Sequence, residues 1–326
     1  MASLSYREAV ARGIAQEMER DERVVLLGED VGAAGGVFKA TEGLFDRFGP
    51  QRVLDTPISE QAILGAAMGA AMTGLRPIAE IMFSDFLAVC WDLVANEIAK
   101  ARYMTAGQVE LPLVIRTANG GGVRFGAQHS QSVQNWAMAV PGLKVVTPSS
   151  PRDVVGLLAA AVRDPDPVLF FEEKSLFAER DEVPEGEIVD ALGRARLCRR
   201  GEDVTIVGLG AMVPVALAAA EILRVEGVEA EVIDLRCLVP LDATMVLESV
   251  RRTGHLVTVE ENPRLCGWGA EVASIVSEEA LFDLDGPVVR VTTPHIPLPA
   301  ADGLEDEARP SARRVVEGAH RSLEGR

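Results

Sequence analysis

The stretch DTPISEQAILGAAMGAAMTGL, residues 55–75, predicts an apolar helix that begins with a single carboxylate. Ser59 is a good N-cap residue, and Glu60 falls in the first turn, where the helix dipole favours a negative charge. Beyond Glu60 the stretch carries no charge and consists mostly of Ala, Gly and Met, so the backbone of a partner could approach it closely. We therefore expect a helix that is buried on all sides.

Glu60 has two interpretations. An acid in the first turn often serves only to stabilise its helix. However, the strand-like residues Arg52, Val53 and Leu54 come shortly before it, which places Glu60 in a strand-to-helix loop. Open α/β sheets bind their ligands at such loops. The position therefore favours a functional carboxylate, suited to proton exchange with a nitrogen heterocycle.

Strand and helix patterns alternate along the whole chain, which is typical of parallel sheets covered by helices on both faces. The predicted strands are residues 24–28, 77–82, 113–116, 144–147, 168–171, 203–208, 228–234 and 256–260. The predicted helices are residues 5–20, 85–103, 212–226, 242–252 and 269–280. Two more are predicted, one in the central part of residues 55–75 and one that begins at Ser150. Residues 174–200 lose the periodicity, so we predict an α/β protein with domains at 1–178 and 201–326 and a linker at 179–200.

Composition excludes several classes of protein. A chain of 326 residues with 48% hydrophobic residues is globular and holds about two domains. It has no apolar run that could span a bilayer and no export signal, so we expect a cytoplasmic protein without a membrane partner. The net charge of −17 argues against nucleic acid and suits a basic protein partner, although solubility alone explains it equally well. Four widely spaced cysteines predict reduced thiols, with no disulfide or zinc site.

Four candidate site residues follow predicted strands of the first domain: Glu29, Glu60, Phe86 and His129. The carboxyl ends of parallel strands share one edge of the sheet, so these residues should converge there. Taken singly, Glu29 could be a solvated acid and Phe86 a core residue. His129 is one of only four histidines and lies in a glycine-rich loop, which favours a functional use.

Phosphate-binding motifs are missing from the sequence. Gly208-Leu209-Gly210 lacks the third glycine of a dinucleotide fingerprint, and there is no Walker loop or nucleophile elbow. An acidic site without a diphosphate cradle suggests half of an active site that another subunit completes.

Several motifs together resemble the beta subunit of the thiamine-diphosphate-dependent 2-oxo acid dehydrogenases, a family that includes the pyruvate, branched-chain 2-oxo acid and acetoin enzymes. The matching residues are 28–31, 55–60, 74–80, 128–131, 141–146 and 232–236. The resemblance implies a thiamine-diphosphate pyrimidine-binding domain followed by a transketolase C-terminal-like domain, in an α2β2 heterotetramer. It also implies that the alpha subunit holds the diphosphate and its magnesium ion, so no metal ligand is expected in this chain.

Carried over residue by residue, the resemblance assigns roles to the candidates. Glu60 would pair with a ring nitrogen of the cofactor's pyrimidine, with Glu29 and Ile58 beside the ring and Phe86 stacked on it. His129 would face the substrate and assist transfer to the lipoyl group. A structural potassium ion is also implied, at positions matching Leu113, Ala161, Val162, Asp164 and Asp166.

The implied activity is oxidative decarboxylation of a 2-oxo acid, pyruvate in first place, with the acyl group passed to a lipoyl group. The lipoyl-bearing acyltransferase core would bind this subunit through its subunit-binding domain. The alternatives are the acetoin-cleaving member of the family, a branched-chain 2-oxo acid dehydrogenase, and a non-catalytic assembly protein of the same fold. Glu60 and His129 argue against the assembly protein, because a scaffold needs neither.

Overall fold

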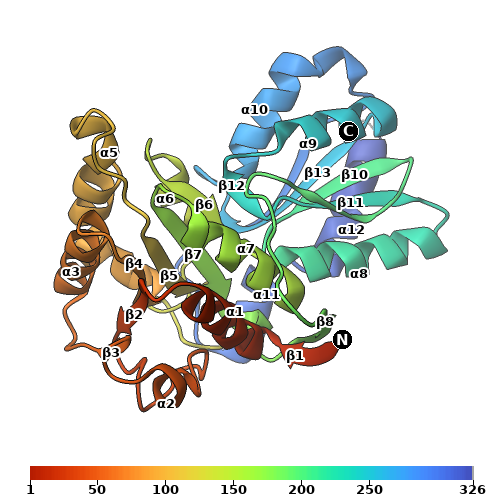
Figure 1. Ribbon diagram of the computed structural model, residues 1–326. Coiled ribbons are helices and arrows are strands. Elements are labelled where there is room, and N and C mark those ends of the chain that lie inside the picture. Colours follow the sequence, from red (N-terminus) through yellow and green to blue (C-terminus); the bar gives the residue numbers. More distant parts are fainter. Residues whose placement is uncertain (325–326) are drawn as a thin grey trace. The chain divides into compact units, whose positions relative to one another are not determined.

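The computed structural model describes residues 1–324 and divides into two compact units. The first unit comprises residues 1–119 and 136–192, and the second comprises residues 120–135 and the chain from Gly193 onward. Figure 1 labels the elements of both. Within residues 1–324, no helix is both long and apolar enough to cross a membrane.

The first unit is built on a parallel sheet, as the alternating pattern predicted. Its strands lie in the order β6-β7-β5-β4-β2-β3, and every neighbouring pair is parallel. Two further strands, β1 and β8, form a separate antiparallel pair. The strands are β1 (Ala2–Ser5), β2 (Val24–Gly28), β3 (Val53–Asp55), β4 (Arg76–Phe83), β5 (Val114–Asn119), β6 (Lys144–Val146), β7 (Val168–Glu173) and β8 (Arg180–Val183).

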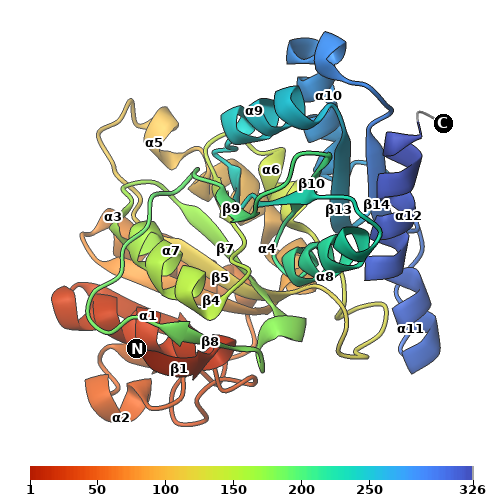
Figure 2. The same ribbon diagram turned by 90° about the vertical axis from the view of Figure 1, so that its right-hand side faces the viewer.

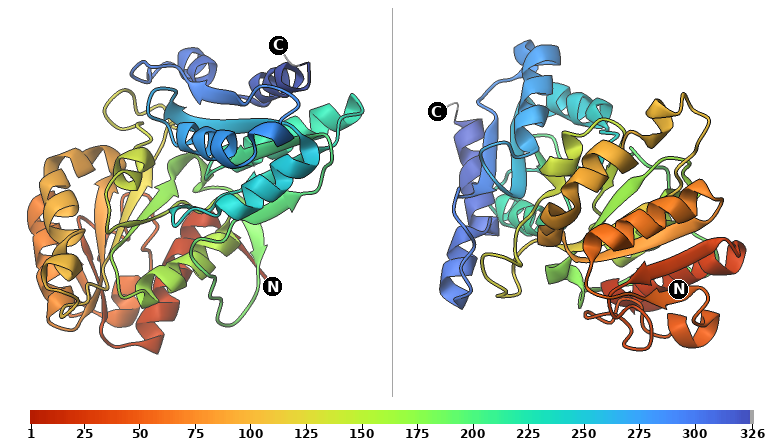
Figure 3. Two further views of the ribbon diagram at one scale, coloured as in Figure 1. Left: turned by 90° about the horizontal axis from the view of Figure 1, so that it is seen from above. Right: turned by 90° about the vertical axis from the view of Figure 1, so that its left-hand side faces the viewer.

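Helices cover both faces of this sheet. Helices α1 and α7 pack against each other on one face, and α3 lies on the opposite face (Figure 3, left). The helical segments are α1 (Tyr6–Arg20), α2 (Leu44–Phe48), α3 (Glu60–Met72), η1 (Ser84–Phe86), α4 (Leu87–Asp92), η2 (Leu93–Ile98), α5 (Ala101–Met104), α6 (Gln134–Met138), α7 (Pro151–Arg163) and η3 (Lys174–Leu176). The predicted capping box of α1 is confirmed, because the Ser5 amide donates to Glu8 Oε2 at 2.6 Å and Glu8 N donates back to Ser5 Oγ.

Two expectations about α3 are wrong. Ser59 occupies the N-cap position, but its backbone is not in the usual capping conformation and its side chain accepts no capping hydrogen bond. The helix is also not buried on all sides in this chain. Its buried face carries Glu60, Ile63, Leu64, Ala67 and Ala71, whereas Gln61, Ala62, Gly65, Ala66, Gly69 and Met72 form an exposed face.

The single helix predicted for residues 85–103 is broken into η1, α4, η2 and α5. Cys90 leaves the helical conformation with φ −119° and ψ 16°, and a π-helical turn follows at Leu93–Ile98. No Pro or Gly lies between Asp85 and Tyr103, so the sequence contains no residue that marks this break.

The second unit contains a five-stranded sheet in the order β14-β13-β10-β11-β9. Neighbouring strands are parallel except β9, which pairs antiparallel with β11 at the edge. Helices α9 and α10 lie on one face, and α8 and α12 lie on the other (Figure 2). The elements are β9 (Arg196–Arg199), β10 (Val204–Gly208), α8 (Met212–Val225), β11 (Ala230–Asp234), β12 (Cys237–Val239), α9 (Ala243–Thr253), β13 (Leu256–Pro263), α10 (Gly269–Glu279), η4 (Leu281–Asp283), β14 (Val289–Thr293), α11 (Asp302–Ala308) and α12 (Ala312–Leu323).

Residues 174–200 are more regular than their composition predicted. They contain η3, the strand β8 that pairs with β1, and the edge strand β9. Both strands lie at sheet edges and are rich in charged residues, which hides the strand pattern in the sequence. None of the four cysteines, all of which lie within residues 1–324, is in a disulfide.

Candidate active site

Three of the candidate residues lie at one edge of the first unit's sheet. Strands β3, β2 and β4 are neighbours and run parallel, and Gly28 at the end of β2 pairs with Asp55 at the end of β3. Glu29 follows β2, Glu60 begins the helix after β3, and Phe86 follows β4. The edge of the sheet therefore gathers residues that lie far apart in the sequence, as expected for an α/β site.

Glu60 and Glu29 form a pair of buried carboxylates. Glu60 is only 9% exposed and Glu29 only 8%. Burial first, and then the nearby charge of Glu60, raises the pKa of Glu29 above its ordinary value. Within residues 1–324, neither carboxylate makes a hydrogen bond or an ion pair with another part of the chain. Since buried polar groups are normally paired, these two acceptors suit a ligand that brings its own N–H donors.

Cys90 lies near Glu60 and next to Phe86. The Phe86 ring is half-buried and packs edge-on against Phe83, with ring centroids 5.4 Å apart. The Cys90 thiol contacts the carbonyl oxygen of Phe86 at 3.8 Å. Burial and then the charge of Glu60 raise the pKa of Cys90 to about 12, so this thiol stays protonated. Sequence reasoning placed Cys90 only among reduced thiols, and its one signal was the spacing of four residues from Phe86.

The loop between β3 and α3 is fixed by its backbone. Thr56 N donates to Gly28 O at 2.9 Å, and Asp55 Oδ1 accepts a hydrogen bond from Gly32 N at 2.6 Å. Ile58 is 80% exposed, two residues before Glu60. An apolar side chain in this position is available to contact a ligand or a partner chain.

A buried ionic cluster lies next to the carboxylate pair, and sequence reasoning missed it. Arg116 on β5 donates to both oxygens of Glu172 on β7, at 2.8 and 2.7 Å, and also pairs with Glu80 on β4. All three residues are less than 10% exposed. A Cβ atom on Gly28 would lie 2.8 Å from Glu80 Cβ, so only glycine allows this close approach. Burial is the main cause that raises the pKa of Glu80, and Arg116 opposes it.

His129 lies in the other unit. It belongs to residues 120–135, here called the His129 loop. A hydrogen bond from Gly120 N to Gln131 O, at 3.1 Å, joins the two sides of this loop. His129 is half-buried, and its amide donates to Gly126 O. Of the candidate site residues, the first unit thus contains Glu29, Ile58, Glu60 and Phe86.

The residues matched to a potassium ion surround the turn between α7 and β7. Lys144 Nζ lies 2.6 Å from Asp164 Oδ1, and Arg102 Nη1 lies 2.6 Å from Asp166 Oδ1. Burial alone would raise the pKa of Asp166, but the hydrogen bond from Arg102 and the charge of Lys144 hold it below its ordinary value. Arg76 donates to the carbonyl oxygen of Val162 at 2.7 Å. In residues 1–324, no group of three or more His, Cys, Asp or Glu side chains could hold a metal ion.

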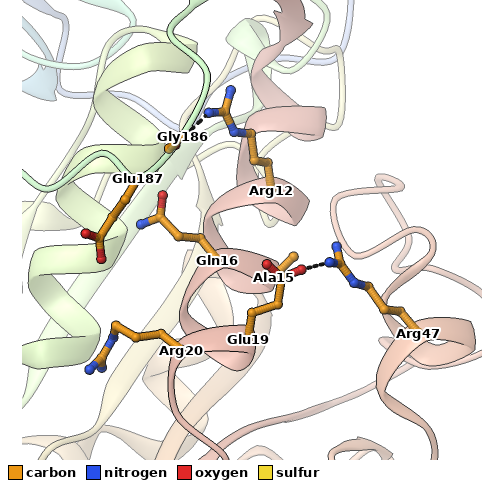
Figure 4. Close-up of a pocket in the computed structure, with 8 residues that line it drawn as sticks. All are labelled: Arg12, Ala15, Gln16, Glu19, Arg20, Arg47, Gly186 and Glu187. Atoms are coloured by element: carbon orange, nitrogen blue, oxygen red, sulfur yellow. Dashed lines mark hydrogen bonds and ion pairs between the residues drawn. The ribbon is translucent and has the colours of Figure 1, made fainter.

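A separate surface pocket of about 600 Å³ lies along α1 (Figure 4). It is lined by Arg12, Ala15, Gln16, Glu19, Arg20, Arg47, Gly186 and Glu187. Its basic groups are already engaged, because Arg47 pairs with Glu19 and Arg12 donates to the carbonyl oxygens of Pro184 and Gly186. The pocket contains none of the candidate residues and is distinct from the sheet-edge site.

Comparison with known proteins agrees with this architecture. The transketolase pyrimidine-binding domain matches residues 2–179, and the transketolase C-terminal domain matches residues 193–315. A split-gene transketolase, solved as an inactive beta4 tetramer, superposes with a TM-score of 0.82 and 27% identity, covering 99% of both chains. Fold and site therefore define a transketolase-like protein with two α/β domains.

Similar proteins of known identity define the family within this class of transketolase-like proteins. The chain is 47% identical to the beta subunit of acetoin:2,6-dichlorophenolindophenol oxidoreductase from Cupriavidus necator, over 99% of this chain and 98% of that protein. It is also 47% identical to the 2-oxoisovalerate dehydrogenase beta subunit of Bacillus subtilis, over 94% of each. Identity to a mitochondrial pyruvate dehydrogenase E1 component subunit beta of Oryza sativa is 44%, over 98% of this chain and 86% of that protein. The chain belongs to the family of beta subunits of the 2-oxo acid dehydrogenases.

Proposed function

We propose that this chain is the beta subunit of a thiamine-diphosphate-dependent 2-oxo acid dehydrogenase and provides the pyrimidine half of its active site. The observation that carries the proposal is the pair of buried carboxylates, Glu29 and Glu60, at the edge of a parallel sheet. Both lack a donor within residues 1–324, so they suit the N–H groups of an aminopyrimidine. The half-exposed ring of Phe86 offers an aromatic face beside them.

When bound, thiamine diphosphate supplies the carbon that attacks the substrate and accepts the electron pair released by decarboxylation. The residues of this chain position it and move protons. Glu60 holds a proton at the ring nitrogen of the pyrimidine. Glu29 shares the buried environment of Glu60, and Ile58 and Phe86 contact the ring and exclude water from it. His129 faces the substrate and assists the later transfer of the acyl group to the lipoyl acceptor.

The other half of the site is assigned to an alpha subunit, which would hold the diphosphate and magnesium ion in an α2β2 heterotetramer. The missing phosphate motifs of this sequence support that division. The purified chain should therefore have no decarboxylase activity and bind the cofactor weakly. Mixing it with the alpha subunit encoded beside it should restore both. Robust turnover by this chain alone would contradict the proposal.

Pyruvate is the first proposed substrate, and a second candidate is acetoin. The two acetoin relatives, at 47% and 45% identity, support acetoin over pyruvate, whose relatives are at 42% to 44%, but the 2-oxoisovalerate relative is also 47% identical and supports a branched-chain substrate equally. The reconstituted complex should be given pyruvate, 2-oxoisovalerate and acetoin in turn, with dichlorophenolindophenol as electron acceptor. Carbon dioxide is released only from the 2-oxo acids, whereas acetoin cleavage gives acetaldehyde. Product analysis therefore separates the candidates.

Two finer points belong to the same proposal. A potassium ion near Asp164 would be held by backbone carbonyl oxygens, because Lys144 and Arg102 already neutralise the two carboxylates. A higher melting temperature in potassium chloride than in sodium chloride would support the ion, and equal values would exclude it. The cytoplasmic location stays a prediction, since several relatives are named as mitochondrial.

A further inference from the structure

The His129 loop is held by residues that lie far away in the sequence. One end is held by α11 and the other by the end of β13. The arc between these two attachments, residues 125–131, carries His129. The conformation of the arc therefore depends on the side chains that hold its ends.

Glu305 on α11 is the centre of the first attachment. It is completely buried, and its carboxylate accepts hydrogen bonds from Gly122 N at 2.7 Å and from Arg124 N at 3.1 Å. The Arg124 guanidinium donates to the same carboxylate at 2.6 Å. Hydrogen bonds to an ionised acceptor are shorter and stronger than neutral ones, so this carboxylate fixes both backbone and side chain of the loop.

The loop needs such a restraint at Arg124. Its φ angle is 65°, in the left-handed region that non-glycine residues rarely adopt. A residue persists in such a conformation only when its surroundings enforce it. Asp302 and Asp306 add ion pairs to Arg124 at 2.9 and 2.7 Å, so α11 as a whole holds this residue.

The second attachment involves Glu261 and Asn262 on β13. Ser132 Oγ donates to Glu261 Oε2 at 2.9 Å, and Asn262 Nδ2 donates to Ser132 O at 2.8 Å. Arg309, which follows α11, donates to Glu261 Oε1 at 2.6 Å. A Cβ atom on Gly122 would collide with the Arg309 guanidinium, so Arg309 lies directly against the start of the loop. The two attachments are thus linked through Arg309.

We infer that Glu305 is a positioning residue of the enzyme: it fixes the His129 loop, and thereby the place of His129 in acyl transfer to the lipoyl group. Glu305 does not itself meet substrate or cofactor. The inference rests on the proposed function, because the step it serves is the one assigned to His129. A displacement of about 1 Å at a reacting group can reduce a rate about 10²-fold, so loss of the attachment should be visible in that step.

The first arm of the test uses the purified chain and needs no activity. Amide hydrogen exchange at Gly122 and Arg124, and trypsin cleavage after Arg124, are compared in wild type, Glu305→Gln, Glu305→Ala and Glu317→Ala. Glu317 is an exposed acid on α12 and pairs with Arg313, so it is a matched control away from the loop. The Ala variant should exchange and be cleaved faster, Gln should be intermediate because it keeps one acceptor oxygen, and the control should match wild type. Unchanged protection in Glu305→Ala overturns the inference.

The second arm uses the complex with the alpha subunit. Glu305→Ala should lower lipoyl acylation about 10²-fold while reduction of the dye acceptor stays near wild type. Glu305→Gln keeps the side-chain volume, so partial rescue by Gln separates positioning from a folding defect. A loosened loop with normal lipoyl acylation overturns the positioning role. If instead the wild-type complex acts on none of the substrates, the proposed function fails, and the exchange arm still reports whether Glu305 holds the loop.

Discussion

At the scale of single residues, the site is organised by carboxylates that lack neighbouring cations. Arg116 neutralises Glu80 and Glu172, but no basic group pairs with Glu29 or Glu60 within residues 1–324. Burying an unpaired carboxylate is unfavourable, so evolution keeps one mainly where chemistry uses it. This difference between two adjacent acid clusters distinguishes a structural ion network from the pair that we propose to be reactive.

Glu60→Gln is the most direct test of the reactive pair. The change keeps the shape and the helix but removes the ionisable group, so the complex should assemble and bind cofactor. A positioned acid or base contributes about 10² to 10⁴ in rate, roughly 3 to 5 kcal/mol, whereas a first-turn dipole interaction contributes about 0.3 to 1 kcal/mol. Exchange of the cofactor's C2 proton and substrate turnover, both in the complex, should fall by the larger factor. Near-wild-type exchange would leave Glu60 as a helix-start acid.

Ionisation of Glu29 should lower the stability of the folded chain as the pH rises. Its pKa is raised on folding by burial and by Glu60. A group with a raised folded pKa contributes stability that is fully present below the unfolded pKa, about 4.3 for Glu, and is lost as the pH rises through the folded pKa. The Gln side chain of the Glu29→Gln variant does not ionise, so this variant does not lose stability in this way. Its melting temperature should therefore exceed that of wild type at pH 8.

The gap between Glu29→Gln and wild type should shrink as the pH falls toward about 4, where the wild-type carboxyl is protonated as well. Thermal melts between pH 4 and pH 8 measure it, and Glu42→Gln, at an exposed acid, is the control. A gap that does not change with pH would show that packing, not ionisation, causes the effect.

At the scale of elements, α3 shows what a sequence pattern can and cannot specify. The Ala-Gly-Met pattern correctly predicted an apolar helix after a strand, with Glu60 in its first turn. It also predicted burial on all sides, but Gly65, Ala66 and Gly69 are exposed in this chain. An apolar face that packs inside one chain and an apolar face that packs against a second chain have the same composition, so sequence alone cannot separate them.

Gly69→Leu should block assembly without harming the fold. A Cβ atom at Gly69 meets no heavy atom within 4 Å, so the chain itself tolerates the larger side chain. If a partner backbone packs closely on this face, Leu would hold it away. Light scattering should then show a loss of the complex with the alpha subunit at an unchanged melting temperature. Gly303→Leu is the matched control, since Gly303 is also helical and open. Normal assembly of Gly69→Leu would exclude a close contact there.

The His129 loop gives a second prediction at this scale. Sequence composition correctly indicated an irregular glycine-rich segment, but its attachments to Glu261 and Glu305 could not be read from local pattern. His129→Ala should reduce lipoyl acylation by about 10² while dye reduction and cofactor binding stay close to wild type, because in the function we propose the imidazole serves only the later step. Loss of cofactor binding and assembly together would make His129 a structural residue.

At the scale of the whole molecule, the alternation of strands and helices through residue 280 was largely predictable, because most elements carry their own periodicity, whereas β8, β9, β14 and α12 were not predicted. The parallel sheets and the edge that collects Glu29, Glu60 and Phe86 follow from that order. The order of elements does not predict that residues 120–135 belong to the second unit, because their position depends on side chains more than 120 positions away. The Glu80, Arg116 and Glu172 cluster was missed because its partners lie 36 and 56 positions apart on three different strands.

The net charge of −17 leads to the last prediction, for binding to the basic subunit-binding module of the acyltransferase core. Opposite charges speed association, with rate constants up to about 10⁸ M⁻¹s⁻¹ or more at low salt against about 10⁵ to 10⁶ without steering. Raising salt from about 0.1 to 1 M shortens the screening length from about 10 to about 3 Å. Stopped-flow measurements should therefore show the association rate falling steeply with salt while the dissociation rate changes little. Association that does not depend on salt would mean that an apolar surface, not the acidic one, recognises the module.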